Sequence, residues 1–306
     1  NNYMKIKIII AAVCVATAMI FCGCGKDKYN PSEKISKIYH QYDAEYGKEL
    51  SEIWEWDGNN LSAIYWEEDK SEGFKFEYDK KDLITKVSLI DADSEDDLGY
   101  LKYTYDGKKL DKVEYCGKVE GVGEVVAYRL SYEYSGSKIS KISFSYNSAI
   151  EMYDSPKKAK KLLSLVLPKK AIEKLPSSTI ATKAVKANEE FIKTVDMEWT
   201  WEKDNITKLK SNYYGEEGEV ETETESFKYD TKNSPFYNFP SSTMILEYGY
   251  FPSKNNIVRE QWEGNDYYST YEIKYNDKDY PTEATRKSTG SDGEVYVGTT
   301  TYYEYK

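Results

Sequence analysis

The chain has 306 residues, with 42 Lys and Arg against 53 Asp and Glu, 31 Tyr, 6 Trp and a single His. This length leaves room for one large β domain or two smaller ones, and the formal net charge of −11 argues against nucleic acid or another polyanion over most of the surface. With His40 alone, a histidine-dependent triad or a multi-histidine metal site is nearly excluded.

The N-terminal segment resembles a bacterial lipoprotein signal peptide. Lys5 and Lys7 form a short basic region, residues 8–21 are an apolar run, and Cys24 follows directly after Gly23. The run is shorter than the roughly 20 apolar residues of a membrane-spanning helix. The resemblance implies that residues 1–23 are cleaved and that Cys24 is lipidated. An uncleaved anchor or ordinary secretion is the alternative.

Beyond the signal peptide, residues 24–36 are expected to form a tether. Residues 37–306 are then a β domain with a helical insertion at about 155–195. Cys116 is the one other cysteine left after cleavage, so it has no partner for an intramolecular disulfide. A lone cysteine inside a strand is expected to be buried and unreactive rather than a nucleophile.

One phrase recurs along the domain: two aromatic residues two positions apart, a small polar residue, a tight turn, and two aliphatic residues three positions apart. Side chains alternate along a strand, so both rings lie on one face, and Asp-Gly favours a hairpin turn with positive φ. The clearest copy is Tyr103, Tyr105, Asp106, Gly107, Leu110 and Val113. Other copies begin at Trp54, Phe76, Tyr132, Trp199, Phe227 and Ile273.

The acidic residue of the phrase is interpreted as a turn residue. Asp57, Asp79, Asp106 and Asp230 occupy the same position in four copies, whereas a catalytic carboxylate is needed once or as a pair. Carboxylates are plentiful enough for a glycosidase, but nothing in the sequence singles out two acids of unequal pKa. We therefore expect no enzyme activity, no catalytic residue, no metal site and no cofactor.

Two acidic runs invite a further interpretation. Residues 91–97 could bind calcium, but Asp96 stands where an EF-hand needs Gly, so a solvated loop is preferred. Glu219, Glu221, Glu223 and Glu225 alternate along a strand, and a turn at 216–218 would set lysines of the preceding strand opposite them. The expected pairs are Lys210 with Glu223 and Lys208 with Glu225.

The spacing of the apolar residues changes from that of strands to that of helices between residues 152 and 195. Pro156 can open a helix, with Leu162, Leu163 and Val166 at helical spacing, and a second helix is expected over 183–195. Residues 156–193 hold ten Lys against three Glu. This charge could lie across an acidic sheet and stay solvated, or it could contact anionic lipid headgroups or an acidic polysaccharide. The candidate contacts are Lys157, Lys158, Lys160 and Lys161.

Aromatic residues of the opposite parity should point away from the packed face. Outward rings can stack on sugars or contact a partner protein, although isolated exposed rings are common on sheets without a function. The candidates for ligand binding are Tyr65, Tyr100, Tyr268 and Tyr302.

The phrase resembles the YD repeat of bacterial surface and toxin shells. Turns such as Tyr229-Asp230-Thr231-Lys232-Asn233-Ser234-Pro235-Phe236 make it more similar to the uncharacterised YD-repeat-like lipoproteins of gut Bacteroidota. The resemblance covers most of residues 50–306. It implies a lipid-anchored β protein and brings no catalytic residues with it.

The expected fold is mainly β, an antiparallel meander of about a dozen strands curled into an open barrel or half-barrel. The Lys-rich helices would cover one mouth or fill the concave side. The expected location is the bacterial outer membrane, through the lipid on Cys24, at the cell surface or on the periplasmic face.

The expected function is a non-catalytic binding module for a glycan or a protein partner. A carrier or sensor of an apolar ligand held in the curled sheet is one alternative, and a purely structural envelope protein is another.

Overall fold

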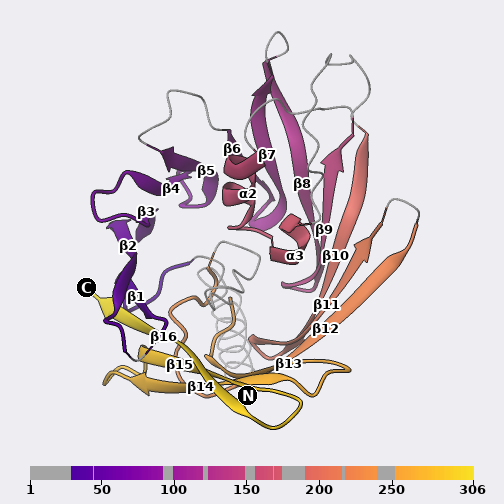
Figure 1. Cartoon of the computed structure of the whole chain (residues 1–306). Coiled ribbons are helices and arrows are strands. Elements are labelled where there is room, and N and C mark those ends of the chain that lie inside the picture. The colour runs from indigo at the N-terminus through magenta and orange to yellow at the C-terminus, as the bar shows by residue number, and fades with distance from the viewer. Residues whose placement is uncertain are drawn as a thin grey trace, which may run out of the picture.

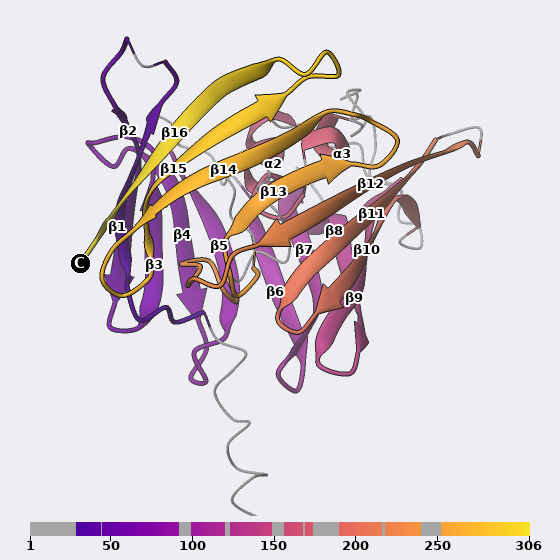
Figure 2. The same ribbon diagram turned by 90° about the horizontal axis from the view of Figure 1, so that it is seen from below.

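The computed structural model describes residues 29–43, 45–91, 99–119, 123–148, 156–167, 169–173, 190–215, 218–239 and 252–306. In these residues sixteen strands form one closed antiparallel barrel, in which each strand pairs with its neighbours in the sequence (Figure 1, Figure 2). The strands are β1 Ile35–Gln41, β2 Glu49–Asp57, β3 Asn60–Tyr65, β4 Glu72–Tyr78, β5 Ile84–Asp91, β6 Tyr100–Asp106, β7 Lys109–Val119, β8 Gly123–Ser135, β9 Lys138–Asn147, β10 Phe191–Glu202, β11 Asn205–Tyr214, β12 Val220–Tyr229, β13 Ile257–Trp262, β14 Tyr268–Tyr275, β15 Pro281–Thr289 and β16 Val295–Tyr305.

The barrel closes where the first strand pairs with the last. Ile38 of β1 lies opposite Tyr303 of β16, in an antiparallel ladder that runs from Ile35 to Gln41. The expectation of a mainly β antiparallel meander is confirmed, but the expectation of an open sheet is wrong. The pairing of β1 with β16 leaves neither as an unpaired edge, which removes the exposed backbone groups that an open sheet would carry.

The recurring aromatic phrase builds the inner wall. Tyr103 is buried, and Tyr105 packs partly buried against the same core. The turn that follows has Gly107 at a φ of 62°, and Val113 lies opposite Tyr103 across the hairpin. The paired rings therefore face the interior, as the alternation predicts.

The second ring of the phrase also joins neighbouring hairpins. Between β7 and β8 the ladder ends at Lys112 and Ser131, and the Leu110 carbonyl beyond it accepts a hydrogen bond from the Tyr134 hydroxyl at 2.9 Å. A side-chain donor thus satisfies a backbone carbonyl that the ladder leaves unused. We call these contacts aromatic clasps. The others join Trp56 to Ile35, Tyr78 to Leu61, Trp201 to Ile139, Tyr229 to Ile206 and Tyr305 to Pro281.

The outer wall carries charged and polar side chains. Some pair across strands, as Lys274 does with Glu283 at 2.8 Å and Lys86 with Glu77 at 3.6 Å. A lipid-facing wall is apolar instead, and each Lys or Arg at the bilayer midplane costs about 2–4 kcal/mol. This wall is therefore suited to water. Exposed positions within its strands include Lys75, Glu77, Lys102, Glu133, Glu198, Lys228, Glu272 and Glu304.

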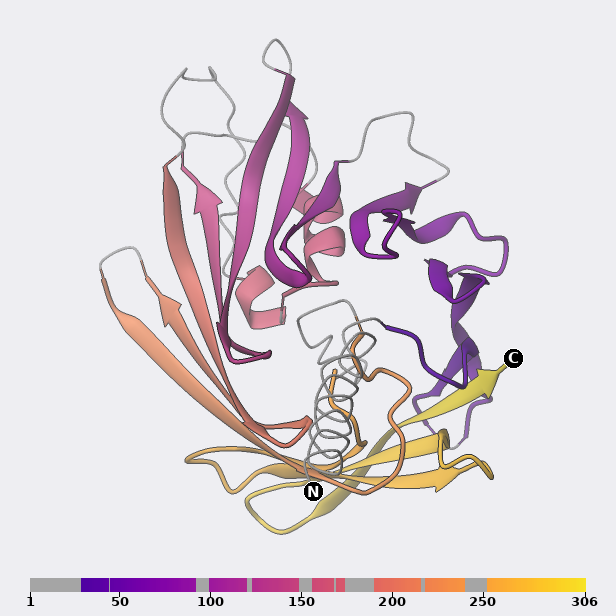
Figure 3. The same cartoon turned by 180° about the vertical axis from the view of Figure 1, so that it is seen from behind.

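Two short helices, α2 (Pro156–Leu163) and α3 (Lys169–Glu173), lie inside the ring of strands (Figure 3). Leu162, Leu163 and Val166 are fully buried in the common core. The Lys-rich segment thus fills part of the concave side, which is one of its two expected places. Within the described ranges, no helix is both long and apolar enough to cross a membrane.

The second expected helix, over 183–195, is corrected in its last part. Residues 183–189 lie outside the described residues, and Phe191 to Val195 begin β10. Val195 lies opposite Phe144 of β9. Phe191, Ile192, Thr194 and Val195 are aromatic or β-branched, so they favour a strand when a partner strand is available.

Candidate ligand-binding cavity

A cavity of ≈ 370 Å³ lies inside the end of the barrel at which the short hairpin turns gather. Its outer part is bounded by the turn residues Asp82, Lys108, Ser137 and Asp204. Asp82, Lys108 and Ser137 are exposed, so the cavity reaches the surface at this end. Its volume lies at the lower end of the range of small-molecule sites.

Aromatic side chains dominate the lining. Tyr78, Tyr134 and Trp201 are each fixed by an aromatic clasp. Tyr105 occupies the same position of the phrase but differs, because its hydroxyl has no hydrogen-bond partner in the part of the chain that the structure describes. The complete set of lining rings is Tyr29, Tyr78, Tyr105, Tyr134, Trp199, Trp201, Tyr237 and Phe239.

The segment after β12 supplies the inner boundary of the cavity. Phe236 and Phe239 are buried in the common core. The Phe239 ring meets Tyr29 edge-on, with ring centroids 4.9 Å apart, and the Tyr29 hydroxyl donates to the Pro235 carbonyl at 2.9 Å. Tyr29, within the expected tether 24–36, therefore belongs to the barrel interior, and β1 already begins at Ile35.

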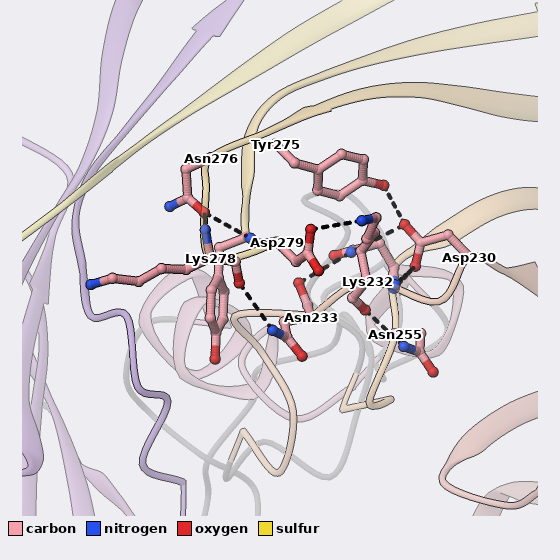
Figure 4. Close-up of polar contacts among 10 residues, drawn as sticks. Asp230, Lys232, Asn233, Asn255, Tyr275, Asn276, Lys278 and Asp279 are labelled. Carbon is pink, nitrogen blue, oxygen red and sulfur yellow. Dashed lines mark hydrogen bonds and ion pairs between the residues drawn. The ribbon is translucent and has the colours of Figure 1, made fainter.

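A polar network holds this inward segment in place (Figure 4). Asp230 Oδ1 accepts the Lys232 backbone N–H at 2.9 Å, and Asp230 Oδ2 accepts the Tyr275 hydroxyl. The Lys232 ammonium pairs with Asp279 at 2.6 Å, which ties the segment to the turn between β14 and β15. Asp79 likewise accepts the backbone N–H groups of its own turn. Both aspartates thus have the turn role expected from the sequence.

Lysine side chains lie over two of the cavity rings. Lys138 pairs with Asp204 at 2.7 Å and lies 4.8 Å from the centroid of Trp201. Lys109 donates to the Gly136 carbonyl at 2.7 Å and lies 5.0 Å from the centroid of Tyr134. Lys109 has no carboxylate partner among the described residues. Both contacts have cation–π geometry.

Trp199 and Trp201 differ in how their indole N–H groups are used. The two rings lie on one face of β10 with centroids 5.9 Å apart. The Trp201 N–H donates to the Ile139 carbonyl at 2.7 Å, whereas the Trp199 N–H is buried without a partner in the described part of the chain. A buried donor without an acceptor is costly.

A second polar group lies inside the barrel on β12 to β15. Glu225 shares the inward face of β12 with Phe227, and Glu260 of β13 pairs with Arg286 at 2.8 Å. Burial raises the pKa of Glu225 to about 7, and the nearby charges of Glu260 and Glu223 act in the same direction. The sequence analysis names Glu225 as a partner of Lys208, whereas the structure makes it an inward-facing acid with a raised pKa.

The position of Glu225 corrects the expected register of this hairpin. The turn closes through the Gly215 N–H and the Glu219 carbonyl at 2.9 Å, so that Leu209, rather than Lys208, lies opposite Glu225. A shift of one residue moves the acids to the inner face. There Lys170 of α3 pairs with Glu221 at 2.7 Å and also with Glu223, while Lys210 lies opposite Thr224.

The four outward tyrosines of the sequence analysis lie on four different strands, β3, β6, β14 and β16, and the structure does not gather them into one site. Each has a cation of the protein itself over its ring, which occupies one of the faces that a ligand could use. The contacts are Lys70 with Tyr65 at 5.6 Å, Lys86 with Tyr100 at 4.7 Å, Arg259 with Tyr268 at 3.8 Å and Lys48 with Tyr302 at 5.5 Å.

The candidate lysines of the insertion all fall in α2. Lys161 pairs with Glu72 and lies 4.1 Å from the centroid of Trp66, and Lys160 is partly buried. The side chains of Lys157 and Lys158 lie outside the described part. Part of the charge of this segment is thus neutralised within the protein.

The remaining candidates from the sequence are the two cysteines, Cys116 and Cys24, and the acidic run 91–97. Cys116 is buried, and burial raises the pKa of its thiol to about 11, so the reactive thiolate does not form at neutral pH. Cys24 and residues 92–97 of the acidic run lie outside the described residues. Among the residues that are described, no group of three or more His, Cys, Asp or Glu could hold a metal ion.

No family model matches the chain, and no curated protein matches it. A porin-like protein from Bacteroides vulgatus is similar in structure, with 9% identity, a TM-score of 0.49 and coverage of 90% of this chain and 99% of that chain. A porin-like protein from Bacteroides uniformis has 10% identity, a TM-score of 0.48 and coverage of 92% and 100%. A Tc holotoxin pore from Photorhabdus luminescens has 11% identity, a TM-score of 0.21 and coverage of 82% and 12%. What the barrel binds has to be inferred from its own side chains.

Proposed function

We propose that this protein is a non-catalytic binding protein of the cell envelope, and that it holds a small glycan in the aromatic cavity at the turn end of the barrel. The observation that carries the proposal is the lining of that cavity, in which aromatic rings lie beneath a mouth of charged side chains. A sugar ring matches both, because its C–H faces pack against aromatic rings and its hydroxyls need hydrogen-bond partners.

This proposal moves the main glycan contact from the outer wall to the interior. Tyr65, Tyr100, Tyr268 and Tyr302 each have a cation of the protein over the ring, whereas the cavity rings are gathered in one place. The outward tyrosines stay candidates for a weaker contact with a glycan chain or a partner protein.

A glycan array with the purified full chain, followed by calorimetric titration of the glycans that bind, tests the proposal. Ser137→Trp should block the mouth, because Ser137 lines the cavity and is exposed. Ser135→Trp is the matched control, since Ser135 is exposed on the same turn but is not part of the lining. Binding that is absent from the array, or that Ser137→Trp leaves unchanged, would contradict the proposal.

A carrier or sensor of an apolar ligand is the second candidate function. It is supported by the inward direction of the rings, which sets them in the barrel rather than on its surface. Native mass spectrometry of the protein purified from its own membranes should then show a bound lipid. If neither a glycan nor a lipid binds, a protein partner or a purely structural role is left.

We also propose that a lipid on Cys24 holds the barrel at the outer membrane, on the cell surface. The resemblance of the N-terminal segment to a lipoprotein signal peptide supports this. The charged outer wall is suited to water rather than to lipid, so a separate anchor would be needed to hold the barrel at a membrane. Cys24→Ala should release the protein from the membrane fraction, and protease treatment of intact cells separates the surface from the periplasmic face. Retention of Cys24→Ala in membranes would argue instead for contacts such as Lys157 and Lys158 with anionic headgroups.

A further inference from the structure

We infer that the glycan in the cavity is anionic, a sugar residue that carries a carboxylate, and that Tyr105 and Lys109 of the hairpin β6–β7 recognise it. This inference rests on the proposed function, because it names the class of ligand for the same cavity.

The Tyr105 hydroxyl is available to a ligand. Tyr78 and Tyr134 occupy the same position of the phrase on β4 and β8, and the hydroxyl of each donates a hydrogen bond to a backbone carbonyl of the neighbouring hairpin. Tyr105 lies between them, lines the cavity, and makes no hydrogen bond within the described residues. A hydroxyl that both donates and accepts is suited to a sugar hydroxyl or a carboxylate.

The Lys109 ammonium supplies the charge. Lys138, its counterpart on the next hairpin, is neutralised by Asp204 at 2.7 Å. Lys109 has instead a neutral acceptor, the Gly136 carbonyl, together with the face of Tyr134. It lines the cavity beside Lys108 and has no carboxylate partner in the described part of this acidic chain. A ligand carboxylate would give Lys109 the charge-assisted hydrogen bond that it lacks.

A lysine is also held over a clasp ring outside the lining of this cavity. Lys34 donates to the Gly58 carbonyl at 2.5 Å and lies 5.5 Å from the centroid of Trp56, and it is not part of the cavity lining. The contact of a lysine with a turn carbonyl and an aromatic face is therefore a general feature of these hairpins. Lys109 differs from Lys34 in that it lines the mouth of the cavity. Lys34 serves as the matched control for any effect of Lys109.

The test compares two probes on the purified full chain by calorimetric titration: a short oligogalacturonate, and the same oligosaccharide with its carboxyl groups reduced to alcohols. The acidic probe should bind more tightly, with a preference that weakens as salt is added. Lys109→Gln should lower the affinity for the acidic probe by about tenfold and leave the neutral probe unchanged. Lys34→Gln should change neither.

Tyr105→Phe should lower the affinity for both probes, because the Tyr105 hydroxyl can form a hydrogen bond with a sugar hydroxyl as well as with a carboxylate. Tyr78→Phe should leave both affinities nearly unchanged, since the Leu61 carbonyl already holds its hydroxyl. Equal affinity for the two probes, or a Lys109→Gln variant with an unchanged preference, would overturn the anionic ligand and leave the proposed function standing. If the wild-type chain binds no glycan at all, the proposed function itself fails.

Discussion

The Tyr134 hydroxyl donates to the Leu110 carbonyl at 2.9 Å, across a gap that the ladder between β7 and β8 does not reach. Tyr134→Phe removes this donor and leaves the carbonyl without it, so we expect a loss of about 1 kcal/mol in the free energy of unfolding. Urea-induced unfolding measures the difference. Tyr105→Phe is the control and should change stability by less than about 0.5 kcal/mol, because its hydroxyl has no partner in the described residues. Equal losses for the two variants would show that the clasp does not stabilise the barrel.

The two tryptophans of β10 offer a second matched pair. Trp201→Phe leaves the Ile139 carbonyl without its donor and should lower the free energy of unfolding by about 1 kcal/mol beyond the cost of the smaller ring. Trp199→Phe removes a buried N–H that has no partner among the described residues, and it should cost less than Trp201→Phe. Unfolding in urea compares them. A greater loss for Trp199→Phe would mean that its N–H does stabilise the fold.

Glu225 should make the stability of the barrel depend on pH. Its pKa is about 7 in the folded protein and about 4.3 in the unfolded chain. The folded state therefore holds the proton more tightly, so this group stabilises the fold at low pH and its contribution falls as pH rises from about 4.3 through 7, by about 3–4 kcal/mol. Glu225→Gln should be nearly as stable as wild type at pH 4 and more stable at pH 8.

Unfolding measured across this pH range separates Glu225 from its neighbours. Glu223, Glu260 and Arg286 act on the same carboxyl, so a smaller slope in Glu225→Gln, rather than a flat line, is the expected result. Glu198→Gln on the exposed outer wall is the control and should leave the slope unchanged. An unaltered slope in Glu225→Gln would assign the pH dependence to another group.

Asp230 should couple the stability of the inward segment to ligand binding. Asp230→Ala removes the acceptor for the Lys232 N–H and the Tyr275 hydroxyl, so we expect a loss of about 2–3 kcal/mol in the free energy of unfolding and a weaker glycan affinity. Asp106 occupies the same position of the phrase and makes no side-chain hydrogen bond within the described ranges. Asp106→Ala should therefore leave the free energy of unfolding nearly unchanged. Calorimetric titration and urea unfolding of both variants check this.

The inner wall could be predicted from the sequence because it depends on a local rule. Tyr103 and Tyr105 are two residues apart, so they share a face in any strand. Closure of the barrel depends on the pairing of Ile38 with Tyr303, which no local pattern encodes. The turn expected at 216–218 is the one that the structure has, with Gly215 opposite Glu219, but the expected lysine pairs lie one residue out of register with it. Counted from that turn, Leu209 lies opposite Glu225, and a difference of one residue reverses the face.

The cavity could not be predicted for a different reason. Tyr105 and Tyr134 stand at equivalent positions of the same phrase, and the difference between them is whether a carbonyl of the adjacent strand lies within reach of the hydroxyl. The ends of the ladders do not distinguish the two tyrosines, because the β5–β6 ladder ends at Lys102 and the β7–β8 ladder at Ser131, each three residues before its tyrosine. The outward tyrosines illustrate the converse, since alternation gave their direction but not the cations that lie over Tyr100 and Tyr268.

The packing of Tyr29 inside the barrel limits how far Cys24 can lie from the barrel. Cys24 precedes it by five residues, and an extended chain covers at most about 3.6 Å per residue, or about 18 Å in all. A lipid on Cys24 would therefore hold the turn end of the barrel close to the bilayer, and the opposite end would point away from it. The mouth of the cavity would open toward the membrane surface, so that a ligand would enter through the thin layer between barrel and lipid rather than from the open medium.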